Sequence, residues 1–565
     1  MSIPTTDVSQ SELMRHLSHI AAEVRLSGTP EEARAFDYVA GELARWGYSV
    51  NRYACPALTG YPQRSTLTMV APKQLDVACN GYSLSPSTPE SGVAGLLVDA
   101  RDGLPADFAA VDARGKIVIT DGLATPAKAL AAARAGAIGH IHVNGDHIHE
   151  MCISPIWGTP TPETAHLLPS VPALAVTGDT GAALREALAR GPVTLSLMTV
   201  PYYGWSEIPV LTADLPGTDE DTYVLFSGHI DSWHLGVMDN GTANATQMEL
   251  ARIFAEHRGE LRRGIRLAFW SGHSHARYAG STWYADTFFD DIGTRCVAHV
   301  NIDSVGAKGA VVLEEAPTMA ETYAYTRDVL KAAGDVDLNY HRISRSSDQS
   351  FWGHGVPTTL AALSEQLVDD SPTSKAHAAL LGAKGRAGGL GWWWHTTEDT
   401  LDKIDPEFLE RDARLYLAVL WGLLTRDRLP YEPAAGLREL AEGLRDHERA
   451  AAGQLALADL ATRADALAVR IEALPLATMQ LADANALVMD LCRRIIVLNY
   501  TGSGPHDHDL ALGTAPAAGL REASTLGALD PATSEARFLK TKLVRSRNRI
   551  SAGLRDLEMR LPAVD

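Results

Sequence analysis

The region from residue 208 to residue 425 alternates strand-like apolar runs with segments of helical spacing. This alternation constrains the fold more than any other feature of the chain. The strand-like runs are residues 223–227, 264–270 and 296–302, and the helical segments between them are residues 244–257 and 280–288. Such an order indicates βαβ units. We therefore predict an α/β fold in which a mostly parallel mixed sheet is flanked by helices.

The regions on either side differ in the spacing of their apolar residues. Between residues 57 and 200, short apolar runs separated by Gly, Pro and Asp predict a small β-rich domain. From about residue 431 onward, the spacing is almost wholly helical. The predicted domains are thus residues 1–56 plus 201–430 for the α/β domain, 57–200 for the inserted β-rich domain, and 431–565 for a helical domain. A terminal helical domain with apolar faces is often a dimer surface, so we expect a homodimer formed through residues 431–565; the alternative is that these helices only cover the sheet.

Charge and composition exclude several classes of partner. The formal net charge of −19 argues against nucleic acid and against anionic membranes as partners. No run of eighteen apolar residues occurs, so we expect no membrane span. The first residues lack a secretory signal, and the five cysteines are scattered without CxxC spacing. These features predict a cytoplasmic location.

Histidine and aspartate residues follow the predicted strands. His229 and Asp231 come after the first strand, Asp239 lies in a turn beyond it, and Asp303 follows the third strand. His395 lies on a later loop, after three tryptophans. Polar residues at the carboxyl ends of such strands point into the ligand crevice. Because imidazole and carboxylate groups are the donors that zinc and similar metals prefer, the set predicts a metal site.

These segments resemble the M28 family of co-catalytic zinc peptidases. The matching stretches are Gly228-His229-Ile230-Asp231-Ser232, Met238-Asp239-Asn240-Gly241, Asn301-Ile302-Asp303-Ser304, Ser347-Asp348-Gln349-Ser350 and His395-Thr396-Thr397-Glu398-Asp399. The "GKIVIT" strand at residues 115–120 and the Ala-rich helix after it resemble a protease-associated domain. Together with the helical end, the order resembles the glutamate carboxypeptidase II and transferrin receptor arrangement. The resemblance implies one or two divalent metal ions, preferably zinc: His229 and Asp303 would bind one ion, His395 the other, Asp239 would bridge them, and Asp231 would support His229.

The stretch at residues 273–275 departs from the family. Counted back from Gly280 and Ser281, the family's Glu-Glu pair falls on Ser274 and His275. The first Glu of that pair is the family's general base and the second is a metal ligand. His275 can replace a carboxylate as a ligand. Ser274 cannot replace a general base, because a free hydroxyl does not accept a proton near neutral pH.

Two candidates for the missing base follow from proximity in sequence, namely His273 and Glu398. We therefore predict metal-dependent hydrolysis of an amide-type bond in a peptide or small molecule, with Asp231, His273 and Ser274 as the catalytic group. Two alternatives stay open: a non-catalytic binding protein on a peptidase scaffold, and a metal-dependent reaction other than hydrolysis. Near the motifs, Arg342 and Arg345 are candidates for gripping a substrate carboxylate.

Overall fold

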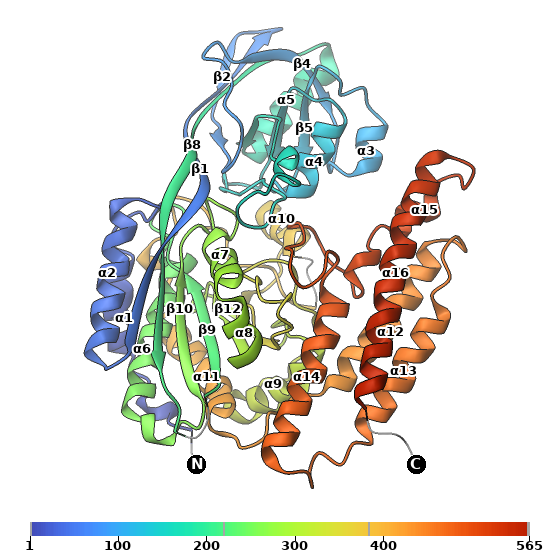
Figure 1. Ribbon diagram of the computed structural model, residues 1–565. Helices are drawn as coiled ribbons and strands as arrows, with labels where there is room; N and C mark the ends of the chain where they lie inside the picture. The colour runs from blue at the N-terminus through green and yellow to red at the C-terminus, as the bar shows by residue number, and fades with distance from the viewer. Residues whose placement is uncertain (1–2, 219–220, 382–384, 562–565) are drawn as a thin grey trace.

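The computed structural model describes residues 3–218, 221–381 and 385–561 (Figure 1). Its strands are β1 (Ser49–Ala71), β2 (Leu75–Val77), β3 (Asn80–Gly81), β4 (Val93–Asp99), β5 (Ile117–Asp121), β6 (Gly139–Val143), β7 (Ala173–Val176), β8 (Thr194–Leu215), β9 (Tyr223–His229), β10 (Gly264–Trp270), β11 (Cys296–Asn301), β12 (Ala310–Val312), β13 (Thr358–Thr359) and β14 (Glu365–Gln366). Its α-helices are α1 (Gln10–Ile20), α2 (Pro30–Arg45), α3 (Pro105–Ala109), α4 (Pro126–Arg134), α5 (Gly178–Arg190), α6 (Ala243–Glu256), α7 (Ala279–Thr287), α8 (Phe289–Arg295), α9 (Ala320–Gly334), α10 (Pro372–Leu381), α11 (Pro406–Thr425), α12 (Pro433–Ala450), α13 (Ala458–Glu472), α14 (Leu481–Tyr500), α15 (Ala523–Ala528) and α16 (Ser534–Arg560).

A single sheet runs through most of the molecule. The order of its strands is β13-β11-β9-β10-β8-β4-β5-β6-β7-β3, with β1 and β2 attached beside β8. The strands β13, β11, β9 and β10 are parallel to one another, while β8 is antiparallel to β10. This arrangement confirms the predicted α/β class with its mixed, mostly parallel sheet flanked by helices.

Two long antiparallel strands, β1 and β8, connect the two halves of the sheet (Figure 1). They have 23 and 22 residues, so each extends through both regions that the sequence separates. The predicted boundaries at residues 56 and 200 therefore fall inside these strands. The chain between them, residues 72–193, is here called the inserted lobe. It contains the parallel strands β4, β5, β6 and β7.

Both faces of the part of the sheet that contains β9 are buried, and successive side chains of this strand belong to two different cores. On β9, Val224 and Phe226 belong to the core under α1, α2, α6 and α11, whereas Tyr223 and Leu225 belong to the core on the other face. Successive side chains of a strand point to opposite faces, so an apolar run buried on both sides has this pattern. The helices α7 and α8 cover the second face (Figure 1).

The last helices form a bundle with its own apolar core. The helix α12 packs against α13 and α14, and α16 packs against both of these (Figure 1). Residues such as Leu440, Leu467 and Leu554 are buried in this core. Among the described residues, no helix combines the length and apolar character needed to cross a membrane.

Candidate metal centre

The predicted ligands come together because neighbouring parallel strands end at the same edge of the sheet. His229 is the last residue of β9, and Asp303 follows β11 by two residues. The loop after β10, the neighbour of β9 on the side away from β11, carries His273, Ser274 and His275. Carboxyl ends of parallel strands are the usual position of ligand sites in open α/β sheets. Asp239 reaches this edge from the turn Val237–Thr242, which precedes α6.

The carboxylate of Asp239 lies between two histidines. Its Oδ1 is 3.2 Å from Nε2 of His229, and its Oδ2 is 2.9 Å from Nε2 of His395. Oδ1 of Asp303 lies 3.8 Å from the same His229 nitrogen. One carboxylate that offers one oxygen to each of two imidazoles has the geometry of a bridging ligand.

Three histidines around this point are held through their Nδ1 atoms. A carbonyl or carboxylate oxygen can only accept a hydrogen bond, so an Nδ1 beside one carries the proton and leaves the Nε2 lone pair free. The contacts are His229 Nδ1 with the Asp231 carbonyl at 2.8 Å, His395 Nδ1 with the Glu150 carbonyl at 2.6 Å, and His273 Nδ1 with Asp348 Oδ2 at 2.6 Å. Metal-binding histidines are oriented in this way in proteins. His275 differs, because its Nδ1 lies 2.9 Å from Ser27 Oγ and accepts a hydrogen bond from the Ser27 backbone N–H at 3.2 Å.

Four buried polar atoms at the site have no hydrogen-bond partner among the described residues. They are His229 Nε2, Asp239 Oδ1, His275 Nε2 and Ser274 Oγ. Buried polar groups are nearly always paired, and an unpaired group calls for an explanation such as an ion. Two imidazole nitrogens and a carboxylate oxygen are suitable donors for zinc. The residues therefore fit a divalent cation.

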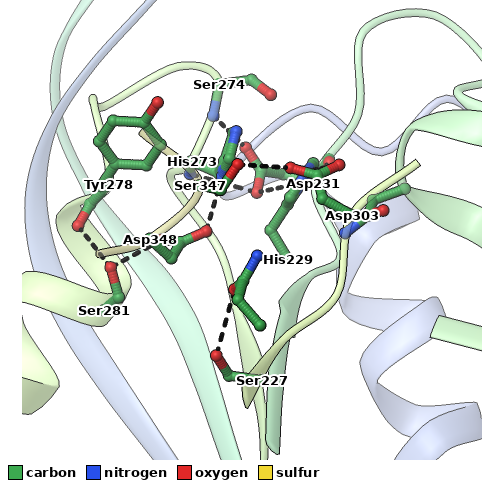
Figure 2. A network of polar contacts seen from close by, with 12 residues as sticks. Ser227, His229, Asp231, His273, Ser274, Tyr278, Ser281, Asp303, Ser347 and Asp348 are labelled. Atoms are coloured by element: carbon green, nitrogen blue, oxygen red, sulfur yellow. Dashed lines mark hydrogen bonds and ion pairs between the residues drawn. The ribbon is translucent and has the colours of Figure 1, made fainter. Parts of the chain in front are cut away.

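Asp231 has a different role from the predicted ligands, because its carboxylate oxygens are already used. They accept hydrogen bonds from Ser27 Oγ at 2.9 Å, from the backbone of Ser274 at 2.9 Å and from the backbone of His273 at 3.2 Å. Although burial opposes ionisation, the adjacent His229 and His275 hold the pKa of Asp231 well below its usual range. An ionised Asp231 thus anchors the loop after β10 (Figure 2).

His273 lies directly over His229. Their ring centroids are 3.7 Å apart and the planes differ by 18°. His273, His229 and Asp303 each offer a ligand atom, and these atoms all lie within 4.8 Å of one another. On its other side, His273 is held by Asp348, which in turn accepts a hydrogen bond from Ser281 at 2.6 Å (Figure 2).

Ser274 and His275 are the residues that the sequence analysis aligns with the family's Glu-Glu pair. The hydroxyl of Ser274 is buried and has no hydrogen-bond partner among the described residues. His275 is fully buried against Trp233, whose ring also faces His395; the centroid distances are 4.7 Å and 5.4 Å. Burial lowers the pKa of His275, so its ring is neutral near pH 7. His275 lies outside the compact group of His229, His273 and Asp303.

Four residues that the sequence reasoning did not single out support these groups. Asp399 accepts hydrogen bonds from the backbone of Met238 and Asp239 at 2.8 and 3.0 Å, and burial raises its pKa to about 7. Its neighbour Glu398, the second candidate base, is exposed. The other three supporting residues are Ser27 before α2, Glu150 in the inserted lobe, and Asp348. Asp348 stands in a segment that the resemblance includes, whereas Ser27 and Glu150 carry no sequence signal.

The two candidate carboxylate-binding arginines have structural partners instead. Arg342 pairs with Glu439 and donates to the Asn499 carbonyl at 3.0 Å, so it joins α12 and α14 to the α/β half. Arg345 is buried, donates to the Gln349 carbonyl at 2.7 Å and stacks on Trp157. Neither contact involves the histidine and aspartate cluster.

Comparisons with known proteins agree with this arrangement. Residues 211–420 match the family described as Peptidase family M28, and this segment carries the cluster. The chain is 22% identical over 293 residues to the probable glutamate carboxypeptidase VP8 of Zea mays, and 23% identical over 217 residues to the leupeptin-inactivating enzyme 1 of Streptomyces exfoliatus. These matches cover 47% and 38% of this chain, but only 39% and 48% of those proteins, so the chain spans less than half of either relative.

A solved structure shares the fold. The zinc aminopeptidase BSAP from Bacillus subtilis aligns with a TM-score of 0.55 and 19% identity, covering 76% of this chain and 98% of its own. The expected resemblance to M28 peptidases is therefore confirmed, together with the zinc aminopeptidase-like fold.

Proposed function

We propose that this protein is a metal-dependent hydrolase that cleaves an amide-type bond in a peptide or small molecule. The observation that carries the proposal is the Asp239 carboxylate between His229 and His395, with unpaired Nε2 and Oδ1 atoms facing each other at 3.2 Å. The match of residues 211–420 to the M28 peptidase family supports hydrolysis as the reaction class.

The ligands divide into two groups around Asp239. His229 and Asp303 would hold one ion, His395 and His275 the other, and Asp239 would bridge them. Zinc suits this mixture of imidazole and carboxylate donors, and the Bacillus subtilis protein with the similar fold is a zinc aminopeptidase. When bound, the ions supply Lewis acidity that polarises a carbonyl group and acidifies water.

The remaining groups would transfer protons or hold the loops of the site in position. Asp231 holds the loop after β10 through two hydrogen bonds, which the backbone N–H groups of His273 and Ser274 donate. The hydroxyl of Ser274 is no proton acceptor near neutral pH. His273 is the better base, because Asp348 orients its ring and its second nitrogen lies on the side of His229 and Asp303. The exposed position of Glu398 disfavours it for this role.

The quaternary structure is also part of the proposal. We infer a homodimer formed through residues 431–565, because the outer helix α16 exposes Phe538 and Met559 by 76% and 78%. Large apolar side chains that are exposed to this degree are common at protein–protein interfaces. A peptide or small molecule as substrate and a cytoplasmic location complete the proposal.

The decisive experiment measures bound metal before activity. The purified protein is stripped with a chelator, reconstituted with zinc and analysed by atomic emission, beside Asp239→Ala, Asp303→Ala and the surface control Asp37→Ala. We expect one or two ions per chain in the wild type and the control, and less in the two site variants. Reconstituted wild-type protein without metal would refute the proposal.

Activity is then assayed on amino-acid anilides, dipeptides and small amides. Turnover that depends on the metal and is lost in Asp239→Ala supports hydrolysis. Bound metal without turnover on any amide would favour one of two alternatives: a binding protein on a peptidase scaffold, or a metal-dependent reaction other than hydrolysis. The specific argument for both alternatives is Ser274 at the proposed position of the family's base.

A further inference from the structure

We propose that Arg277 binds a carboxylate of the substrate. The amide-type bond to be cleaved then belongs to a molecule with a free carboxylate close to that bond, such as an N-acyl amino acid. The inference deepens the proposed function and rests on it. Arg277 lies in the loop after β10. The sequence reasoning selected Arg342 and Arg345 for this task, but partners within the fold occupy both.

The guanidinium of Arg277 has few partners in the protein. Its Nη1 donates to the Cys152 carbonyl at 3.5 Å, which is longer than a usual N–H···O bond. Its Nε is buried and has no partner within the described part of the chain. None of the carboxylates that the structure describes forms an ion pair with it. Because a guanidinium carries five N–H donors, most of its binding capacity is unused.

Other arginines that lie inside the protein are satisfied. Arg25 donates to four backbone carbonyls at distances between 2.8 and 3.1 Å. Arg493 donates to three, at distances between 2.8 and 3.3 Å. A charge that is partly removed from water is unfavourable unless it is paired. Arg277 is partly buried and lacks such pairing, so an anion from solution is the partner that suits it.

On one side, Arg277 is connected to the metal centre through Tyr278. Its Cζ lies 5.2 Å from the centroid of the Tyr278 ring. The centroid of the same ring is 4.6 Å from that of His273, and the two planes are nearly perpendicular (Figure 2). Trp157 packs on Tyr278 at a centroid distance of 4.1 Å and holds its ring. The guanidinium and the proposed base therefore contact one fixed phenol ring.

On the other side, one segment of the inserted lobe contacts both Arg277 and His395. The Glu150 carbonyl lies 2.6 Å from Nδ1 of His395, and the Glu150 N–H donates to the His395 carbonyl at 2.9 Å. Cys152, which accepts from Arg277, follows Glu150 by two residues. Two residues span at most about 7 Å of chain. Arg277 and His395 therefore lie along the same short segment, at the border of the metal centre.

The backbone around Arg277 is strained and firmly held. Arg277 and Tyr278 have φ angles of 48° and 69°, in the left-handed region that residues with side chains rarely adopt. Such strain persists where the surrounding structure enforces it, often at ligand sites. The Tyr278 N–H donates to the Gly272 carbonyl at 2.9 Å, and the Gly158 N–H donates to the Arg277 carbonyl at 2.7 Å. The turn thus presents the guanidinium in a fixed orientation.

A guanidinium in a fixed orientation is suited to a carboxylate, which it can bind through two parallel hydrogen bonds. In an N-acyl amino acid, the carbon atom attached to the amide nitrogen also carries the carboxylate. One molecule can therefore present its amide carbonyl to the histidine and aspartate cluster and its carboxylate to Arg277. A neutral analogue of the same shape leaves Arg277 unpaired, and sites built for a polar group discriminate against such analogues.

The test compares ligands that differ only in this charge. N-benzoylglycine and N-acetylphenylalanine are each paired with the corresponding carboxamide. The ratio of kcat/KM within each pair is measured on the zinc-loaded protein. Equilibrium binding is measured by calorimetry on the chelator-treated protein, in which a carboxylate has no zinc ion to bind and no hydrolysis competes.

Three substitutions at residue 277 are compared with a matched control. Arg277→Gln removes the charge, Arg277→Asn does so with a residue that tolerates positive φ, and Arg277→Lys keeps the charge without the planar fork. Arg134→Gln changes an exposed arginine at the end of α4 and is the control. Thermal unfolding and zinc content establish that each variant is folded and retains its metal centre.

Loss of a hydrogen bond to a charged group changes a binding constant about 10–100-fold. We expect the wild type and Arg134→Gln to prefer each acid over its carboxamide by at least about tenfold, with and without metal. Arg277→Gln and Arg277→Asn should lose this preference and bind the carboxamides as the wild type does. Arg277→Lys should keep part of it.

Other results would overturn the inference. A wild type that prefers no acid, or binds none, is one of them. Folded Arg277→Gln and Arg277→Asn that keep the preference are another. Equal weakening of acids and carboxamides would show that Arg277 only supports the loop. Failure of the proposed function has a different signature, because the wild type would then take up no metal, while the preference of the metal-free protein would still be measurable.

Discussion

Nδ1 of His273 lies 2.6 Å from Oδ2 of Asp348, and the carboxylate is buried. Ser281 donates to the other oxygen of the same carboxylate at 2.6 Å. The pair brings an oriented imidazole to the site in which we propose that Ser274 stands in place of the family's carboxylate base. A carboxylate behind a histidine fixes its tautomer and stabilises the protonated ring, as in triads that use histidine as a base.

Replacement of His273 by alanine is predicted to lower kcat by ~10²–10⁴, the range for loss of a general base. Zinc content should stay at the wild-type value, because the ligands His229, Asp239 and Asp303 remain. Steady-state kinetics and metal analysis on the same sample test both statements. A fall in metal content would instead make His273 a ligand. His19→Ala, an exposed histidine on α1, is the control.

Asp348→Asn is predicted to reduce kcat by less than His273→Ala, with little change in KM. The amide keeps the shape of the side chain but can present an N–H to Nδ1 of His273, which favours the opposite tautomer of this ring. The double variant should be no slower than His273→Ala alone, because Asp348 acts through that ring. Independent losses in the double variant would contradict the pairing.

Removal of bound metal is predicted to destabilise the fold. A ligand that binds only the folded state contributes RT ln(1 + [L]/Kd), about 4 kcal/mol at a thousandfold excess over Kd. Thermal unfolding with zinc and with chelator should therefore differ clearly for the wild type and for Asp37→Ala. The difference should vanish in Asp239→Ala. Equal melting temperatures of the wild type in both buffers would argue against a metal centre.

The stability of the protein is predicted to fall between about pH 5 and pH 8 because of Glu321. Burial, together with the nearby Glu439, raises the pKa of Glu321 to about 8, and neither carboxylate oxygen has a hydrogen-bond partner among the described residues. The folded state thus favours the protonated acid. The contribution of protonated Glu321 to the free energy of unfolding is complete below 4.5, the pKa of this group in the unfolded chain. It is lost as the pH rises toward 8. Each unit of difference corresponds to about 1.4 kcal/mol.

Glu321→Gln should remove this part of the pH dependence and raise the melting temperature at pH 8 but not at pH 4.5. Thermal unfolding at several pH values is the measurement. The exposed Glu90→Gln should follow the wild type at every pH. Parallel pH profiles for Glu321→Gln and wild type would contradict the prediction.

Phe538→Asp is predicted to convert the dimer to a monomer, because it places a charge in the proposed apolar contact on α16. Light scattering coupled to gel filtration measures the mass. Leu75→Asp introduces the same charge at a half-exposed position on β2 of the inserted lobe and should leave the mass unchanged. A wild type that is monomeric at all concentrations would refute the proposed dimer.

The local features of the fold were predictable because they depend on neighbouring residues. The strand expected at residues 264–270 is β10 as observed, and the helix expected at residues 244–257 is α6 with a shift of one residue. Thr29 caps α2, Pro30 is its first residue, and two glutamates follow in the first turn, as the sequence indicates. The polar residues that follow the predicted strands likewise identified His229 and Asp303 as candidate metal ligands.

Long-range features were not predictable in this way. The sequence around residues 48–53 indicates a short strand, but its pairing with β8 extends β1 to residue 71 and joins both halves of one sheet. Likewise, nothing local separates Asp399, which is buried and bonded to the Asp239 loop, from the exposed Glu398 beside it. Both outcomes depend on contacts with segments more than 100 residues away.

The sequence by itself determined the chemical types and the order of the predicted ligands, because motif spacing and strand periodicity are properties of contiguous residues. Only the tertiary structure decided which partners orient them: Ser27 for His275, the Glu150 carbonyl for His395 and Asp348 for His273. These partners come from the α1–α2 connection, the inserted lobe and a loop 75 residues downstream. A hydrogen bond needs only that two atoms meet at the right distance and angle. Because the two partners can be any number of residues apart, such a pair produces no periodic pattern in the sequence.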